Sequence, residues 1–211
     1  MNGMRTLRIQ RDRVSRTALS EAVRVLRSGR VVVFPTETAY GLAADPFSRE
    51  AVAAIYAIKG RTNDKKLPLI AADLRQAAAV VRLIGPARRL ALRHWPGALT
   101  IVAPVRSGRR PVGAGARGAT VAVRVPALAW ARALAREFGA PLTSTSANLS
   151  GQPACYSPRE VRKQLVARRR QPELFLNAGA LPRRPPSTIV KIVKGQVVIL
   201  RPGSIKLAES H

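Results

Sequence analysis

The chain has 211 residues, 46% of them hydrophobic, which suffices for the core of one large domain or two small ones. Its 37 Lys and Arg against 11 Asp and Glu give a formal charge of +26, which favours nucleotides or RNA as partners and is equally typical of a coding bias toward arginine and alanine. The single cysteine, Cys155, excludes a disulfide within the chain, and no apolar run approaches the roughly 18 residues of a membrane span.

The first third of the chain alternates helical and extended segments. The N-terminus carries Arg5, Arg8, Arg11 and Arg13 with no apolar stretch behind them, unlike a secretory signal, so we expect a cytoplasmic protein without a membrane partner. Apolar residues then recur at helical or strand spacing, punctuated by glycine and proline. The spacing predicts a helix at 19–26, a strand at 31–34, a hydroxyl-rich loop at 35–41, a helix from 48 to 60 and a short strand at 67–71.

The remainder of the chain continues this alternation. The pattern predicts helices near 73–82, 86–93 and 128–138, and a basic helix at about 158–168. It predicts strands at 99–102, 120–125 and 142–145, and a hairpin of strands 188–193 and 197–200. A mobile basic loop is expected at 106–118, and a polar loop at 146–152 follows the strand at 142–145. Because helices and strands alternate while some neighbouring strands pair antiparallel, we predict an α/β fold, a single domain whose twisted sheet mixes parallel and antiparallel strands and is flanked by helices. The one candidate linker is 179–187.

The loop at 35–41 is the first that could carry chemistry. Thr36 and Thr38 fall on one face of an extended segment, and Tyr40 follows them. Two hydroxyls and a phenol can hydrogen-bond a small polar ligand, while an ordinary turn with satisfied hydroxyls explains the same pattern.

A second motif is Lys59-Gly60-Arg61 at the end of a predicted helix. Two cations beside a flexible glycine can clamp a carboxylate or a phosphate. The alternative is local, because lysine near a helix C-terminus favours the macrodipole and glycine is the usual stop.

The third motif, Ser144 to Gly151, is the densest in polar groups. Ser144, Ser146 and Asn148 belong to a cluster of hydroxyls and an amide that follows a predicted strand. Such a loop suits phosphate oxygens or a ribose, and a polar cap for the next helix is the alternative.

The last two motifs add arginines. The predicted C-terminal hairpin places Ser187 and Arg201 at the same end of its two strands, where they could hold a triphosphate. Arg124 interrupts an apolar strand, and a buried charge there needs a partner, which a ligand could supply, unless the side chain reaches the surface.

Other kinds of site find little support. The chain has no Walker A loop, no GxGxxG at a strand-helix turn and no zinc-ligand spacing. A nucleophilic Cys155 would need a histidine, and the chain has only His94 and the terminal His211. Charge clamping and positioning of ligands are therefore better supported than acid-base chemistry by side chains.

Taken together and in this order, the motifs resemble the YrdC/Sua5 family of threonylcarbamoyl-AMP synthases in its short, single-domain form. The matching segments, which extend from about Ser15 to Ile205, are VVFPTETAYGLAADP, IYAIKGRTNDKKLPLI, HWPGALTIV, TVAVRVP, PLTSTSANLSGQP, PPSTIV and VILRPGSI. The resemblance implies a YrdC-like domain at 15–205, terminal extensions at 1–14 and 206–211, and a large positively charged cavity.

The resemblance also implies the reaction. L-threonine, bicarbonate or CO2, and ATP would give threonylcarbamoyl-AMP and pyrophosphate. A t6A transferase machinery would then pass the threonylcarbamoyl group to adenosine 37 of tRNA, forming t6A37. Mg2+ would enter with ATP, held by phosphate oxygens and water, so no metal ligands are expected from the protein.

Residue by residue, the resemblance assigns roles to the motifs. Lys59 and Arg61 would be the catalytic clamp on carbamate and phosphates, and we expect their replacement by alanine to abolish activity while leaving the fold intact. The ATP contacts would be Lys59, Arg61, Arg124, Ser144, Ser146, Asn148, Ser187 and Arg201. The threonine contacts would be Thr36, Thr38, Tyr40 and Arg124.

Three positions depart from the family pattern: Ala72 stands where a histidine is frequent, Ala98 replaces a proline, and Pro186 stands where an acidic residue is common. The main alternative is a catalytically inactive paralogue that binds RNA, including tRNA or double-stranded RNA. It is supported by the net charge and by the basic stretches at 106–117 and 159–170, whereas intact Lys59 and Arg61 argue against it. A carbamoyl-transfer domain of the hydrogenase-maturation type shares the expected fold but occurs in much longer chains.

Overall fold

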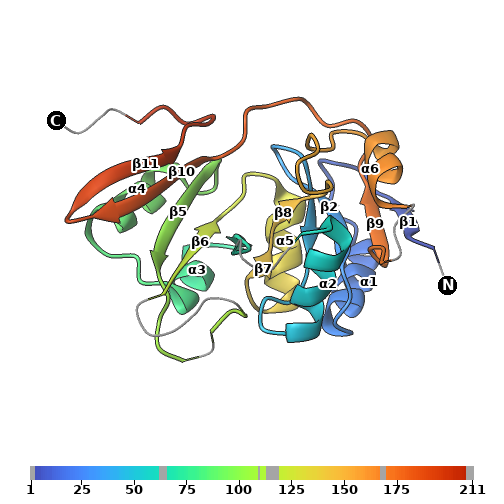
Figure 1. Cartoon of the computed structure of the whole chain (residues 1–211), viewed down its shortest axis with the longest axis horizontal. Helices are drawn as coiled ribbons and strands as arrows, with labels where there is room; N and C mark the ends of the chain where they lie inside the picture. The colour runs from blue at the N-terminus through green and yellow to red at the C-terminus, as the bar shows by residue number, and fades with distance from the viewer. Residues whose placement is uncertain (1–2, 62–65, 109, 113–118, 167–169, 208–211) are drawn as a thin grey trace.

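Two mixed β-sheets form the framework of the chain, and six helices pack against them in the part that the structure describes (Figure 1). The computed structural model describes residues 3–61, 66–108, 110–112, 119–166 and 170–207. The helices are α1 (Arg16–Arg27), α2 (Arg49–Lys59), α3 (Leu74–Val80), α4 (Gly85–His94), α5 (Ala129–Phe138) and α6 (Pro158–Leu165). None of these helices has the length and apolar character needed to cross a bilayer.

The strands divide between the two sheets. In spatial order the five-stranded first sheet contains β1 (Arg5–Arg8), β9 (Leu174–Asn177), β2 (Val32–Pro35), β3 (Tyr40–Ala43) and β8 (Thr145–Ser146). The six-stranded second sheet contains β11 (Gln196–Arg201), β10 (Thr188–Val193), β5 (Leu99–Pro104), β6 (Thr120–Arg124), β4 (Leu69–Ile70) and β7 (Leu142–Thr143). Both sheets are mixed: β2 pairs parallel with β9 and antiparallel with β3, while β5 pairs parallel with β10 and antiparallel with β6.

The first sheet is covered on both faces at its centre, because the central strands β9, β2 and β3 are buried along nearly their whole length. Side chains alternate along a strand, so Val32 and Phe34 pack with α1 and α5, while Val31 and Val33 pack with α2 and α6. The second sheet is buried on the face that packs against α3 and α4, where Leu99 and other β5 and β6 residues form the third apolar cluster. On β11 the side chains of Val198, Ile199 and Leu200 stay exposed.

The ends of helix α2 are set by a serine cap and a glycine, which put Lys59 in its last position. The Ser48 hydroxyl accepts a hydrogen bond from the Ala51 amide at the N-cap, 3.2 Å away. At the other end Gly60 adopts φ 61°, a left-handed conformation that glycine tolerates best. The chain therefore turns sharply after Lys59, and the Arg61 amide donates back to the Tyr56 carbonyl at 3.2 Å.

The expectation of one twisted sheet needs correction, because the hydrogen-bonded strands form two sheets. The predicted strand at 142–145 is split between them: β7 pairs with β4 in the second sheet and β8 pairs with β3 in the first. Ser144 is the crossing residue, and its amide donates to the Pro68 carbonyl at 2.8 Å. Periodicity cannot reveal such a crossing, because a strand of two residues has no period of its own.

Three strands have no counterpart in the sequence prediction. The loop predicted at 35–41 is the turn of a tight hairpin whose second strand is β3, and β1 and β9 pair in parallel with Arg5 opposite Leu174. These strands have four residues each, and their partners lie far along the chain except in the hairpin. The basic loop predicted at 106–118 falls in part on residues 109 and 113–118, outside the described residues.

A single long connection carries the chain from the first sheet to the second near its C-terminal end. Residues 178–187, which we call the connecting segment, run from β9 in the first sheet to β10 in the second, along the top of Figure 1. The Leu181 amide donates to the Tyr156 carbonyl at 2.7 Å, and the Arg183 guanidinium donates to Glu160 at 2.7 Å while lying 4.9 Å from the centre of the Tyr156 ring. The segment is thereby tied to the start of α6.

Candidate functional site

A cavity of about 310 Å3 opens between the two sheets. The first sheet contributes the β2–β3 turn and β8, the second contributes residues of β4, β5, β6, β10 and β11, and the connecting segment contributes Arg184 and Pro186. The polar lining residues among those described are Thr36, Thr38, Tyr40, Thr100, Arg124, Ser144, Thr145, Ser146, Tyr156, Arg184, Ser187 and Arg201. A cavity between sheets at the ends of short strands is a usual location for a ligand site in an α/β fold.

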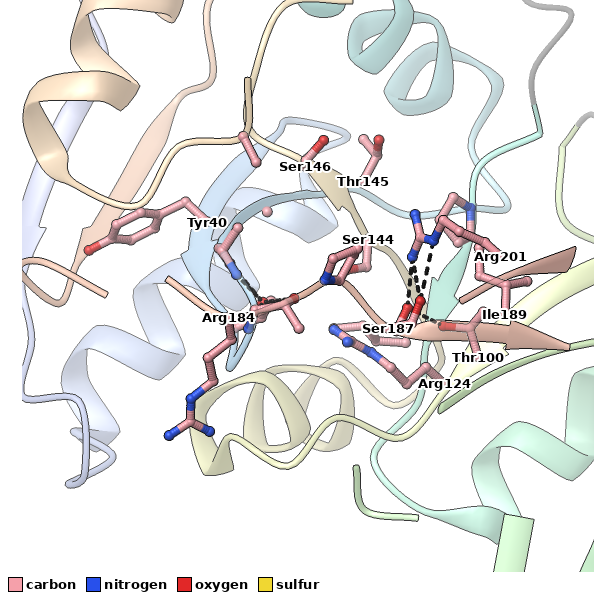
Figure 2. A pocket seen from close by; sticks show the side chains of 18 of the residues that line it. Tyr40, Thr100, Arg124, Ser144, Thr145, Ser146, Arg184, Ser187, Ile189 and Arg201 are labelled. Carbon is pink, nitrogen blue, oxygen red and sulfur yellow. Dashed lines mark hydrogen bonds between the residues drawn. The ribbon is translucent and has the colours of Figure 1, made fainter. Parts of the chain in front are cut away.

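On one side of the cavity, side chains from three strands and the end of the connecting segment converge (Figure 2). Arg201 donates through Nη2 to the Ser187 carbonyl at 2.7 Å and to the Ser187 hydroxyl at 3.1 Å. The Ser187 hydroxyl also lies 2.8 Å from that of Thr100, and Arg124 lies beside this group in the same view. The predicted hairpin thus does bring Ser187 and Arg201 together at one end of its strands.

The arginines are held in a setting that favours an anion. Burial lowers the pKa of Arg124, and burial followed by the positive charge of Arg124 lowers the pKa of Arg201. Three described lining residues are arginines, and none of the described lining residues is acidic. Two neighbouring cations in a partly dry cavity repel each other, and a phosphate or carboxylate placed between them would relieve that repulsion.

Arg124 has a protein partner that the sequence motifs do not reveal. Its Nη1 lies 3.6 Å from Oε1 of Glu37, and both side chains are only 8% exposed. The same oxygen accepts a hydrogen bond from the Ala127 amide at 3.0 Å. The signal in the sequence is that Glu37 is the only acidic residue in the 35–41 loop and that a charge in an apolar strand requires a counter-charge.

The hydroxyl of Thr36 finds its hydrogen-bond partners within the hairpin turn itself. The Thr36 hydroxyl donates to the Ala39 carbonyl at 2.7 Å and accepts hydrogen bonds from the amides of Thr38 and Ala39, each at 3.2 Å. The two threonine hydroxyls lie 3.1 Å apart. Both residues line the cavity, and Thr38 is the more exposed. Thr36 therefore shapes the turn, which leaves Thr38 better able to meet a ligand.

Tyr40 lines the cavity, but its ring points away from the arginine side in Figure 2. Its hydroxyl donates to the Gly179 carbonyl at 2.7 Å and accepts from the Ala178 amide at 3.0 Å. Burial raises the pKa of Tyr40 to about 12. The phenol thus ties the β2–β3 hairpin to the start of the connecting segment, and its hydroxyl already has two backbone partners there.

Lys59 is buried, with 3% of its surface exposed, against the loop that follows β8. Its ammonium donates to the carbonyls of Ser146 at 2.6 Å and Asn148 at 2.8 Å, and to the Asn148 side-chain oxygen at 3.3 Å. Burial, with a smaller contribution from the Arg61 charge, lowers the pKa of Lys59 to about 8. Arg61 lies over the Tyr56 ring, 5.3 Å from its centre. The two motifs singled out in the sequence therefore meet in space.

The 146–148 loop is itself rigidly bonded. The Ser146 hydroxyl donates to the Asn148 side-chain oxygen, and the Asn148 amide group donates to the carbonyls of Leu149, at 2.9 Å, and Gln152. Ser146 lines the cavity, whereas Lys59 and Asn148 lie behind it as the support of the loop. Ser144 lines the cavity at the point where the chain crosses between the sheets.

The structure thus distributes the predicted site residues in two groups. Those that line the cavity are Thr36, Thr38, Tyr40, Arg124, Ser144, Ser146, Ser187 and Arg201. Lys59, Arg61 and Asn148 are not among the lining residues, and Lys59 and Asn148 are joined to the cavity through Ser146. Sequence reasoning missed Thr100, Tyr156 and Arg184 in the lining, because nothing in their local sequence indicates that they face a shared cavity.

Ala72, the position where a histidine is frequent in the family pattern, packs in the apolar cluster with α1 and α5 and does not line the cavity. Cys155 is buried, and burial raises the pKa of its thiol to about 11, which keeps the thiolate form scarce at neutral pH. Within the described ranges no group of three or more His, Cys, Asp and Glu side chains could hold a metal ion.

The sequence is similar to those of known proteins over most of its length. The sequence model of the Sua5/YciO/YrdC family, described as "Telomere recombination", matches residues 24–203. A threonylcarbamoyl-AMP synthase of Chromobacterium violaceum is 38% identical over 174 residues, which is 82% of this chain and 88% of that protein. A threonylcarbamoyl-AMP synthase of Bacillus subtilis is 37% identical over 191 residues, which is 89% of this chain and 54% of that protein.

The fold is also similar to that of a solved structure. The crystal structure of P. abyssi Sua5 complexed with L-threonine superposes with a TM-score of 0.83 and 33% identity, covering 95% of this chain and 57% of the other. The chain therefore spans little more than half the length of some relatives and nearly the whole length of others. A family match over most of the chain, together with identities above 30%, shows that the chain belongs to the Sua5/YciO/YrdC family.

Proposed function

We propose that this chain is a threonylcarbamoyl-AMP synthase that condenses L-threonine, CO2 derived from bicarbonate, and ATP. The observation that carries the proposal is the cavity between the sheets, where Arg124 and Arg201 converge next to the loop that Lys59 supports. Relatives named for this activity, one of them matched over 88% of its length, support the same conclusion. We further propose that residues 15–205 form the catalytic domain, to which β1 adds an edge strand.

The reaction requires two anions to meet. The threonine amine attacks CO2, loses a proton and becomes a carbamate. A carbamate oxygen then forms a bond to the α-phosphorus of ATP, and the bond from that phosphorus to the bridging oxygen breaks to release pyrophosphate. Both reactants are negatively charged, so the transition state needs fixed cations around it. The three arginines that line the cavity and the lysine behind one wall support the proposal of a positively charged cavity suited to that task.

We assign roles by position. Arg201, Ser187 and Arg124 would hold the phosphates, and Ser144 and Ser146 would face the nucleotide. Thr38, in the turn that Thr36 shapes and Tyr40 anchors, would meet threonine. Lys59, held by Asn148 behind the cavity wall, would act on the carbamate and phosphates through its charge, and Arg61 would be the second cation of this clamp. ATP would enter as its magnesium complex, and the product would pass to a transferase that acts on tRNA.

Pyrophosphate release tests the function directly. We expect the purified chain to release pyrophosphate from MgATP only when threonine and bicarbonate are both present, because the carbamate is the nucleophile. Each substrate is omitted in turn, and serine replaces threonine in a further reaction. Release that does not depend on threonine would contradict the proposal. Absence of release from folded protein would favour the RNA-binding alternative, which filter binding of tRNA would then examine.

The dependence of the rate on pH tests the state of Lys59. Its lowered pKa of about 8 means that the ammonium is fully present below about pH 7 and is lost as the pH rises through about 8 in the free enzyme. We therefore expect the clamp to weaken above that value. An arginine at this position stays charged, because its pKa exceeds about 12.

The measurement is kcat/KM for ATP, which reports the free enzyme, at several pH values from about 6.5 to 9.5. Dividing the wild-type value by that of Lys59→Arg at each pH cancels the titration of the substrates. We expect this ratio to fall about tenfold between pH 7 and pH 9, as one pH unit beyond a pKa leaves about a tenth of the group protonated. A constant ratio would show that Lys59 does not titrate in this range.

A further inference from the structure

We propose that Glu37 is a positioning residue that holds Arg124 in the orientation needed to bind the anionic substrates. Glu37 lies in the turn between β2 and β3 of the first sheet, and Arg124 ends β6 of the second sheet. Their ion pair, at 3.6 Å between Oε1 and Nη1, therefore bridges the two sheets beside the cavity. The inference rests on the proposed function for the identity of the substrates.

The carboxylate is itself fixed by a backbone amide. Its Oε1 accepts a hydrogen bond from the Ala127 amide at 3.0 Å, so its position follows the loop that leaves β6. Its Oε2 is buried and has no hydrogen-bond partner within the described part of the chain. A buried carboxylate with an incomplete shell of donors is costly unless a cation lies close by, which makes Arg124 its main source of compensation.

Arg124 in turn depends on Glu37 for its charge and its orientation. Burial lowers the pKa of Arg124, and the Glu37 charge acts in the opposite direction. With Nη1 directed to Glu37, the other N–H groups of the planar guanidinium are left to meet a ligand. Without the carboxylate, Arg124 would be repelled by Arg201 and would have no acidic group within the described lining to hold it.

Glu37 acts through Arg124 and not on the substrate. Arg124 lines the cavity, whereas Glu37 is not among the described lining residues. A carboxylate facing the substrates would repel the phosphates and the carbamate, but one placed behind an arginine neutralises part of its charge and fixes its direction. The turn that carries Thr38 and the strand that carries Arg124 are thereby set relative to each other.

The substitution that isolates this role is Glu37→Gln. Glutamine keeps the volume and the oxygen that accepts from Ala127, and it removes the charge that faces Arg124. We expect kcat/KM for ATP to fall about 10- to 100-fold, because misplacing a binding group by about 1 Å has effects of that size. Glu50→Gln is the matched control, since it removes the same charge from an exposed residue on α2.

A double-mutant cycle separates positioning from a general structural role. In an Arg124→Met background, where Arg124 can no longer be positioned, Glu37→Gln is expected to change kcat/KM by less than about twofold. The double variant also removes both buried charges together, so it should fold at least as well as Arg124→Met alone. If Glu37→Gln lowers kcat/KM by its full factor in that background, Glu37 does not act through Arg124.

Binding of inorganic pyrophosphate, measured by titration calorimetry on the same four proteins, gives a readout that does not depend on synthase activity. We expect Glu37→Gln to weaken this binding in the wild-type background and to have no further effect beside Arg124→Met. Equal affinity of wild type and Glu37→Gln would overturn the inference. Failure of the wild type to release pyrophosphate from ATP would instead count against the proposed function and leave the calorimetric result to decide the role of Glu37.

Discussion

Replacement of Lys59 by alanine is expected to lower the rate of threonylcarbamoyl-AMP synthesis by about 100- to 1,000-fold, the usual effect of removing a preorganised group that stabilises developing charge. The ammonium donates three hydrogen bonds to the Ser146 and Asn148 region, at 2.6, 2.8 and 3.3 Å. Its loss would remove a fixed cation behind the cavity wall and would release the loop that carries Ser146. Both effects act on the transition state.

The buried position of Lys59 modifies what the motif alone predicts. Alanine would leave the buried Asn148 carbonyl and the part-buried Ser146 carbonyl without their donor, and a buried acceptor costs about 1–3 kcal/mol when unsatisfied. We therefore expect Lys59→Ala to fold with a lower free energy of unfolding. Arg61→Ala should lower the rate by a comparable factor with little loss of stability, because Arg61 is only partly buried.

The measurement combines single-turnover formation of the adenylate with urea unfolding of each variant. Arg49→Ala is the control, because it removes an exposed charge from the first turn of the same helix. If Lys59→Ala or Arg61→Ala retained the wild-type rate while folded, the proposed clamp would be wrong. If Arg49→Ala lost activity to the same extent, the effect would be one of overall charge.

Replacement of Arg201 by alanine is expected to raise the KM for ATP by about 10- to 150-fold with a smaller effect on the KM for threonine. The guanidinium donates to the Ser187 carbonyl and hydroxyl and lines the cavity next to Arg124. A hydrogen bond to a charged group contributes about 1.5–3 kcal/mol, which corresponds to that range of affinity. The fold should persist, because the Arg201 side chain lies at the exposed end of β11.

Lys191→Ala is the matched control for this variant, because Lys191 carries the same charge on β10 of the same hairpin and does not line the cavity. Initial rates are measured with ATP varied at saturating threonine and then with threonine varied at saturating ATP. An equal rise in both KM values would show that Arg201 supports the shape of the cavity as a whole. An unchanged KM for ATP would remove Arg201 from the proposed phosphate site.

Much of the local structure can be predicted from the sequence because short-range chemistry decides it. Helix α2 begins at the Ser48 cap and ends at Gly60, as predicted, since both signals act within one turn of the helix. The predicted hairpin of β10 and β11 forms, and it turns at Lys194-Gly195, where both residues take positive φ. The hairpin in turn places Ser187 beside Arg201.

Part of the candidate site could likewise be predicted from local sequence, and part depends on the fold. The polar loops at 35–41, 59–61 and 144–151 could be recognised because hydroxyl, amide and cationic groups cluster at predicted element ends. Which hydroxyls are available could not be recognised, because Thr36 closes its own turn and Tyr40 bonds to the Gly179 carbonyl across the first sheet. Hydrogen bonds between distant segments depend on the packed fold, and the local sequence carries no record of them.

The α/β class, the ends of most helices, the C-terminal hairpin and the family to which the chain belongs were therefore accessible from the amino-acid order alone. Three features required the folded chain: the division of the strands into two sheets, the crossing between them at Ser144, and the pairing of Glu37 with the buried Arg124. The physical reason is that burial of the whole core selects which two-residue strands pair and which carboxylate meets an arginine far along the chain.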